Sequence, residues 1–289
     1  MPKACDLFMK RQLNILERIA EIYTAKKIPR ASAALSYYLT MTFFPLLICL
    51  YTMLGSSYDR VMLMLDFVRG FISAETAGYL EEFLRYVAEN NNKAMMFGSL
   101  AILVTSSSAA MRTFQATIGE IQGRQRFQGL LGFAFSIVFS LVFLAAIYFS
   151  VLVMLTGGEL IDLLSSYLPL IDISDSWNYL RFLLLGGIGF VTVWGVYGVS
   201  VSRDDVYPTW PGALAATVML VAVSMAFSQF IGASTKYPLV YGSLAAVILL
   251  MLWLYTCCIV ILCGAAFNVA RRDSERNCLR PAEEKQREF

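Results

Sequence analysis

Histidine is absent from this chain of 289 residues, and acidic and basic residues together make up only 15% of it. Zinc-dependent hydrolases usually bind their metal through clustered histidine and carboxylate side chains. General acid–base catalysis uses histidine more often than any other residue. The sequence therefore argues against both kinds of enzyme. The low charge also argues against a soluble domain, in which about 25% of residues are charged.

Other common signals are also missing from the sequence. It contains no nucleophile elbow and no glycine-rich dinucleotide motif. It also contains no P-loop, which argues against ATP-driven transport by this chain alone. The six cysteines lie in apolar stretches or in flanks expected to be cytoplasmic, where thiols stay reduced, so no disulfide framework is predicted. The charged N-terminal arm has no early apolar core, so no cleavable signal peptide is expected. We expect no enzymatic activity, no cofactor and no bound metal.

Long uncharged stretches are the main feature that is present. Hydrophobic residues make up 58% of the chain, and six stretches contain no acidic or basic residue. A helix needs about 20 apolar residues to cross the hydrocarbon core of a bilayer, and it satisfies its own backbone hydrogen bonds there. The sequence therefore predicts an all-α polytopic membrane protein with six transmembrane helices, at about 31–55, 94–118, 129–156, 182–202, 211–232 and 243–268.

The distribution of lysine and arginine predicts the orientation of these helices. Seven of these residues lie in the first 30 positions and six follow Ala270. Cytoplasmic flanks of membrane helices are enriched in such residues. We therefore predict that both ends are cytoplasmic, with residues 1–30 as an amphipathic arm, residues 31–270 as the transmembrane domain and residues 271–289 as a charged tail.

Two segments outside the predicted spans have the periodicity of amphipathic helices. In the arm, apolar side chains recur at steps of three and four, which suits a helix in the membrane interface with its basic side toward anionic headgroups; they are Leu13, Leu16, Ile19, Ala20 and Tyr23. In the first outer loop the same pattern involves Leu80, Phe83, Leu84 and Val87. This second helix either forms a lid over the outer mouth or simply packs on the bundle.

A short sequence occurs twice, thirty residues apart. It reads "YPTWPGALAA" from Tyr207 and "YPLVYGSLAA" from Tyr237. Proline suits the first turn of a helix, and small residues just inside allow a neighbouring helix to approach closely. Each copy is therefore expected to begin a transmembrane helix. A remnant of an inverted repeat, as found in many transporters, is the alternative.

The first and last spans carry a resemblance to a known family. The first reads "ASAALSYYLTMTFFPLLICLYTMLG" and the last reads "YGSLAAVILLMLWLYTCCIVILCGAAFN". Together with "SSSAAMR" from Ser106 and the "PG" at Pro211, these resemble the YihY/BrkB family of bacterial inner-membrane proteins. The matching positions at the two ends are Tyr37, Tyr38, Pro45, Leu46 and Leu47, then Tyr241, Gly242, Leu244 and Ala245.

The resemblance implies a multi-pass protein of the bacterial plasma membrane, in a family connected with transport and serum resistance. An older label called its members ribonuclease BN. The sequence argues against that label, because it has no histidine and its acidic residues do not cluster into a metal site, so no nucleic-acid partner is expected. One departure concerns Gly119 and Gln122, which stand where many members place an asparagine followed by an aromatic residue.

Polar residues within the second span are the first candidates for a substrate path. Thr105, Ser108 and Arg112 recur at steps of three and four residues, so they are predicted to share one helix face. A charge at membrane depth is costly and usually faces a cavity or a partner. The alternative is that Arg112 reaches the headgroups and the serines serve only as small packing residues.

The first and last spans supply the remaining candidates. Pro45 lies in mid-span and frees the backbone carbonyl of Met41, which produces either a functional kink or a static one. Tyr37 and Tyr38 precede this kink by two turns. Near the outer end of the last span, the candidates are Lys236 and Tyr241.

No paired carboxylates occur within the spans, which argues against a simple ion antiporter. We therefore expect a transporter that carries a small amphiphile or lipid with an anionic head through a groove or cavity between helices. Tyr37, Ser108 and Arg112 are expected to line that cavity. The alternative is a non-transporting membrane scaffold or regulatory subunit. Membrane lipids are the expected partners in both cases.

Overall fold

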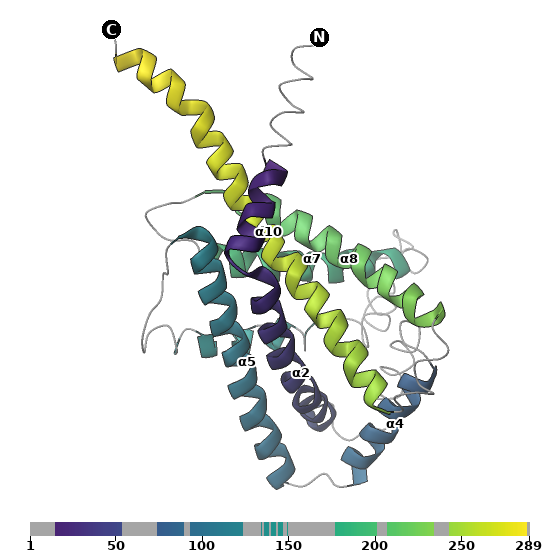
Figure 1. Cartoon of the computed structure of the whole chain (residues 1–289). Helices are drawn as coiled ribbons and strands as arrows, with labels where there is room; N and C mark the ends of the chain where they lie inside the picture. Colours follow the sequence, from purple (N-terminus) through teal and green to yellow (C-terminus); the bar gives the residue numbers. More distant parts are fainter. Residues whose placement is uncertain are drawn as a thin grey trace, which may run out of the picture.

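The structure, a computed structural model, is helical almost throughout the residues that it describes (Figure 1). These residues are 15–53, 74–89, 93–123, parts of 134–149, 177–200, 207–233 and 243–287. The long helices are α2 (Ile28–Met53), α4 (Ala74–Glu89), α5 (Lys93–Gln122), α7 (Trp177–Ser200), α8 (Trp210–Ala233) and α10 (Ser243–Arg287). The predicted all-α class is confirmed within these ranges.

Within the described ranges, four of the helices are long and apolar enough to cross a membrane. They contain the segments Ile28–Cys49, Lys93–Gln122, Trp210–Phe230 and Val247–Arg276. Two shorter apolar helices, Ser136–Ala146 and Leu183–Gly198, fall where the third and fourth spans were predicted. The chain is therefore a multi-pass membrane protein, and the number of six spans stays a prediction.

The last helix extends beyond the predicted span. The span was predicted to end near residue 268 and to be followed by a charged tail, and α10 continues without a break through the tail to Arg287. Its 45 residues correspond to about 68 Å at 1.5 Å per residue. No glycine or proline interrupts the helix where the apolar stretch ends, and Arg271 pairs with Glu275 one turn later at 3.1 Å. The helix therefore passes from apolar to charged sequence while keeping its geometry.

The described part of the N-terminal arm is helical over residues 15–25. Ile15 and Ile22 are its buried side chains, whereas Leu16 is 61% exposed, and Leu13 lies outside the described residues. Ile22 packs into the main hydrophobic cluster of the protein. This helix therefore packs on the bundle through Ile22, and its placement in the membrane interface stays a prediction.

The amphipathic helix α4 packs against the end of α2. Leu84 and Val87 are buried together with Tyr51 of α2. The ring of Phe83 meets that of Phe44 edge to face, with centroids 5.6 Å apart. These contacts favour the simpler of the two interpretations, in which this helix covers the bundle.

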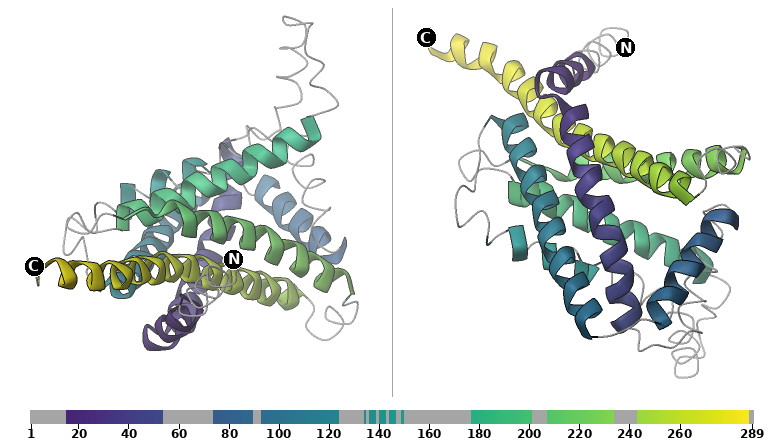
Figure 2. Two further views of the ribbon diagram at one scale, coloured as in Figure 1. Left: turned by 90° about the horizontal axis from the view of Figure 1, so that it is seen from above. Right: turned by 60° about the horizontal axis from the view of Figure 1, so that its bottom comes forward.

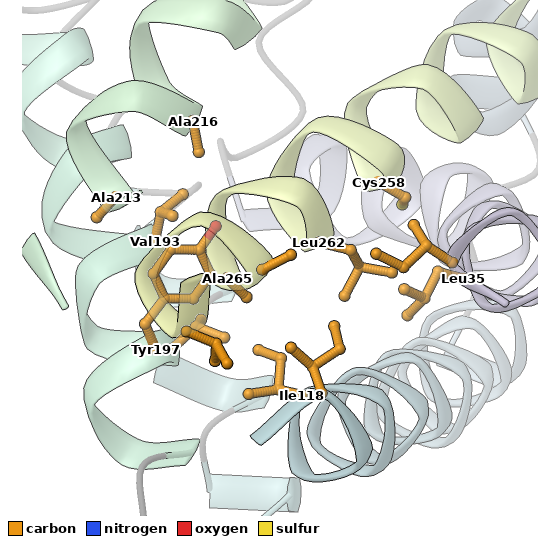
Figure 3. Packing of buried hydrophobic residues seen from close by; sticks show 14 of the residues in the cluster. Leu35, Ile118, Val193, Tyr197, Ala213, Ala216, Cys258, Leu262 and Ala265 are labelled. Carbon is orange, nitrogen blue, oxygen red and sulfur yellow. The ribbon is translucent and has the colours of Figure 1, made fainter. Parts of the chain in front are cut away.

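Helix α2 lies between α5 and α10 and packs against both of them (Figure 2). Helix α8 packs on α10, and α7 packs on α8. The main hydrophobic cluster joins all five helices. Figure 3 shows part of it around α10, with labels on Leu35, Ile118, Val193, Tyr197, Ala213, Ala216, Cys258, Leu262 and Ala265.

The contact between α8 and α10 is made by very small residues. A Cβ atom on Gly212 would overlap the carbonyl oxygen of Gly264 and the side chain of Asn268. A Cβ on Gly264 would lie 2.8 Å from the Cβ of Ala216. The first copy of the repeated sequence therefore begins a helix, as predicted, and its small residues bring α8 close to α10. The second copy lies largely outside the described residues.

Substitution of Gly212 tests this close contact. We expect Gly212→Ala to lower the melting temperature of the purified protein, because a methyl group forced into a packed contact costs about 1–3 kcal/mol or more. Gly189→Ala in α7 is the matched control, since its Cβ would meet no atom within 4 Å. Equal melting temperatures for the two variants would contradict the packing described here.

The orientation can be tested by cysteine labelling in intact cells. In a cysteine-free background, single cysteines replacing Arg85 and Asp175 should react with an impermeant reagent added outside. Cysteines replacing Glu120 and Arg280 should react only after the membrane is opened, because both ends are predicted to be cytoplasmic. External labelling at position 280 would overturn the predicted topology.

Candidate functional site

Hydroxyl groups line the contact between α2 and α5. The Thr42 hydroxyl donates to Oγ of Ser106 at 3.0 Å. Seven residues further along α2, Sγ of Cys49 lies 3.7 Å from Oγ of Ser99, which is seven residues earlier in α5. The two helices therefore run antiparallel, and the two pairs of contacting residues are separated by the same number of residues on each helix. Interhelical hydrogen bonds of this kind help to hold membrane helices together.

A second row of hydroxyls joins α5 to the helix Ser136–Ala146. Ser107 shares a hydrogen bond of 2.5 Å with Ser140, and Ser108 shares one of 3.0 Å with Ser136. All four side chains are buried. Three successive serines of α5 thus contact two different neighbours. The partners at 136 and 140 were not predicted, although serines four residues apart in an apolar stretch are a readable signal.

The third side of α5 is exposed and carries Thr105 and Arg112. Arg112 follows Ser106 by six residues, which places it about 240° around the helix from the α2 contact. The Thr105 hydroxyl donates to its own helix at the Ala101 carbonyl, at 2.8 Å. The positions one turn above and below these two side chains on the same face are small: Ala94, Gly98, Ala101, Ala109 and Ala116. Two large exposed side chains, Phe97 and Ile102, lie on either side of this narrow face.

The candidate residues of α2 point in other directions. Tyr37 is 48% exposed and its ring contacts that of Tyr38, with centroids 5.5 Å apart. Tyr38 packs partly against the main cluster, and Pro45 is buried within a helix that continues past it. Because Thr42 faces α5, Tyr37 lies about 140° away from that contact.

The structure places the expected cavity-lining residues in different surroundings, and a cavity lined by them stays a prediction. Ser108 is buried against Ser136, Arg112 is exposed on α5, and Tyr37 is exposed on α2. Thr105 and Arg112 do share a face. The other two candidates, Lys236 and Tyr241, lie outside the described residues.

A buried asparagine, which sequence reasoning missed, joins α10 to the start of α8. Asn268 is 3% exposed. Its Oδ1 accepts a hydrogen bond from the backbone N–H of Gly212 at 2.8 Å, and its Nδ2 donates to the Thr209 carbonyl at 2.9 Å. The side chain thus satisfies one of the unpaired N–H groups at a helix start. A polar residue inside the last apolar stretch was the available signal.

Tyr197 makes a similar connection from α7. Its side chain is almost fully buried, and its hydroxyl donates to the Ile261 carbonyl of α10. Gly264 leaves room for this ring, since a Cβ there would lie 2.5 Å from the Tyr197 oxygen.

Within the described ranges, no group of histidine, cysteine or acidic side chains is arranged to hold a metal ion.

Comparison with known proteins agrees with this architecture. A family model described as virulence factor BrkB matches residues 19–288, which is nearly the whole chain. The chain belongs to the BrkB family. The resemblance identified from the first and last spans is thereby confirmed.

The chain is similar to several named relatives over most of its length. The chain is 23% identical over 262 residues to the ribonuclease-like protein YfkH of Bacillus subtilis, covering 89% of this chain and 94% of the relative. It is 28% identical over 250 residues to a UPF0761 membrane protein of Chromobacterium violaceum, covering 81% of this chain but 54% of the relative.

A UPF0761 membrane protein of Yersinia pseudotuberculosis is 27% identical over 213 residues, covering 69% of this chain and 66% of the relative. No solved structure matches the chain. The comparisons thus establish a family of membrane proteins.

Substitution of Asn268 should destabilise the bundle. Asn268→Ala removes the partner of the Gly212 N–H and of the Thr209 carbonyl, and each buried group left unpaired costs about 1–3 kcal/mol. We expect a clear fall in melting temperature in detergent. Thr256→Ala is the control on the same helix, because this exposed hydroxyl donates only to the Leu252 carbonyl of its own helix. A melting temperature for Asn268→Ala equal to that of the control would show that the two bonds contribute nothing.

Proposed function

We propose that this BrkB-family protein is a transporter of the bacterial plasma membrane that carries a small amphiphile or lipid with an anionic head. The observation that supports this proposal is a narrow exposed face of α5, where small side chains alternate with Thr105 and Arg112 between the exposed apolar side chains of Phe97 and Ile102. The head of the amphiphile would bind at Arg112. Its apolar chain would lie along the small residues.

Arginine suits the proposed head group for a physical reason. Its planar guanidinium presents several donors in a fixed fork that matches phosphate and carboxylate oxygens. A charge within a membrane span is costly, and an anion that accompanies it lowers that cost. Arg112 is exposed on a helix of the bundle, so a molecule in the bilayer can reach it without entering a closed cavity.

The small residues suit an apolar chain. Alanine and glycine leave the helix backbone close to the surface, which allows a neighbour to approach closely along several turns. The relevant positions follow one another at steps of three or four residues: Ala94, Gly98, Ala101, Thr105, Ala109, Arg112 and Ala116. In this proposal the path runs over the face of α5 and differs from the cavity expected from the sequence.

We further propose that the chain is not an enzyme and does not act on nucleic acid. The sequence contains no histidine, and histidine is the usual acid–base catalyst in metal-free RNA cleavage. The name of the Bacillus relative concerns that relative. Activity of the purified protein on RNA would disprove this part of the proposal.

A membrane scaffold is the second candidate, and α8 favours it. Large apolar side chains are exposed along one side of this helix, at Trp210, Leu214, Val218, Val221 and Met225. Steps of three and four residues make this a continuous stripe. A helix of a partner protein could pack along the stripe, and a scaffold would need no path on α5.

Binding of anionic lipid to Arg112 variants tests the transporter proposal. We expect Arg112→Ala to reduce binding of phosphatidylglycerol to the protein in nanodiscs about tenfold, since a hydrogen bond to a charged group contributes about 1.5–3 kcal/mol. Arg112→Lys keeps the charge but loses the fork, so its loss should be smaller. Binding can be measured by native mass spectrometry, with Arg85→Ala on the exposed side of α4 as the control.

Two further results separate the readings of Arg112. If the residue binds lipid, the melting temperatures of the Lys and Ala variants should stay close to that of the wild type. A large fall in melting temperature would instead indicate a structural ion pair, whose loss costs about 3–5 kcal/mol when buried.

Ala101→Trp should block the small face of α5 and reduce lipid binding, whereas Met219→Trp on an exposed side of α8 should not. Unchanged lipid binding in Arg112→Ala would disprove the proposed site.

A further inference from the structure

A two-residue turn, Lys26 and Lys27, separates the helix of residues 15–25 from α2. Lys27 has a φ of 52°, which is the left-handed region that lysine rarely adopts. The backbone around it is nevertheless well bonded. The Lys26 N–H donates to the Ile22 carbonyl at 2.9 Å, and the Lys27 carbonyl accepts from the Arg30 N–H at 2.9 Å. Lys27 therefore ends one helix and begins the next, so it acts as a single-residue joint.

Contacts with distant parts of the chain hold the helix of residues 15–25 in place. Ile15 and Ile22 are buried. The guanidinium of Arg18 donates to Oδ2 of Asp273, at 3.2 and 3.3 Å from its two nitrogens, across 255 positions of sequence. Arg18 also pairs with Glu21 at 2.8 Å. Figure 1 shows this short helix beside the charged extension of α10.

The same acidic residue links the short helix to the start of α8. Asp273 accepts from Arg272 at 3.2 Å. The guanidinium of Arg272 lies over the ring of Tyr207, 5.2 Å from its centre. Tyr207 directly precedes the turn that Asn268 holds through Thr209. The N-terminal helix, α10 and the start of α8 are therefore joined by one chain of contacts.

The charges in this chain of contacts stay accessible to salt. The side chains of Arg18 and Asp273 are 49% and 25% exposed. Hydrogen bonds from the Arg18 side chain to Glu21, and then to Asp273, raise the pKa of Arg18. It therefore remains protonated at any physiological pH, and ionic strength is the condition that weakens the pair.

We propose that residues 15–25 form a clasp, which turns at Lys27 and is latched to α10 by the ion pair between Arg18 and Asp273. Unlatching would free residues 15–25 from the charged extension of α10. This conformational device is independent of what the protein transports. An exposed ion pair changes an equilibrium by about 1.4- to 5-fold, so loss of the latch should shift the ratio of open to closed molecules by about that factor, while the burial of Ile15 and Ile22 still favours the closed form.

Distances between two spin labels can test the clasp in the full-length protein. The six cysteines are replaced, and labels are attached at position 20 on the clasp and at position 219 on α8, which are both exposed. The protein is studied in nanodiscs at about 0.05 M and about 0.5 M salt, since the screening length falls from above 10 Å to below 8 Å over this range. The fraction of molecules at long distance measures opening.

Charge reversal gives the sharpest comparison. We expect Arg18→Glu to raise the ratio of open to closed molecules two- to fivefold at low salt, and Asp273→Arg to do the same. The double variant restores an opposite pair and should lower the ratio below that of either single variant, although Glu21 and Arg272 now lie beside like charges. Glu17→Lys is the control, since this exposed residue lies on the same helix one position away. Lys27→Gly should lower the ratio, because glycine adopts the φ of 52° found in the closed form without the steric cost that lysine has there.

Each result decides one part of the proposal. If Arg18→Glu and high salt both leave the distances unchanged, the ion pair is not a latch. If the single variants open the clasp but the double variant does not close it, the pairing of these two residues is wrong. If Lys27→Gly leaves the ratio unchanged, Lys27 is not the joint.

Discussion

The close contact of α8 with α10 is the constraint on which the rest of this bundle depends. Lipid chains are as apolar as the helices, so burial of apolar surface does not by itself hold membrane helices together. Here Gly212 and Gly264 allow the two backbones to touch, and Asn268 adds two hydrogen bonds at the same place. Tyr197 then connects α7 to the same section of α10.

A different chemistry holds the other half of the bundle. Hydroxyls of α5 pair with Thr42 of α2 on one side and with Ser136 and Ser140 on another. Each bond is small in energy, because membrane helices find other partners when one is lost. Together they set the rotation of α5. That rotation exposes the side of the helix that carries Arg112, and the proposed amphiphile site depends on it.

The family and the structure together leave two proposals for the function, a transporter and a membrane scaffold. Membership of the BrkB family makes the chain a multi-pass membrane protein. The hydroxyls that the sequence suggested as path residues are partly used in packing, as Ser108 shows. Arg112 and Thr105 stay on an exposed face. The transporter proposal therefore depends on a membrane-facing site, and the scaffold alternative depends on the exposed stripe of α8.

The sequence by itself determined the helical class and the approximate position of the four helices long enough to span, because a helix in lipid needs a long uncharged stretch that is visible by inspection. Its motifs also identified the family. It did not determine which side of each helix meets its neighbours. In a soluble helix the apolar side identifies the buried face, but in a membrane both the lipid-facing and the protein-facing sides are apolar. Only the tertiary structure could turn Ser108 toward Ser136, Asn268 toward Gly212 and Arg18 toward Asp273, since each pair joins segments whose mutual orientation is set by packing.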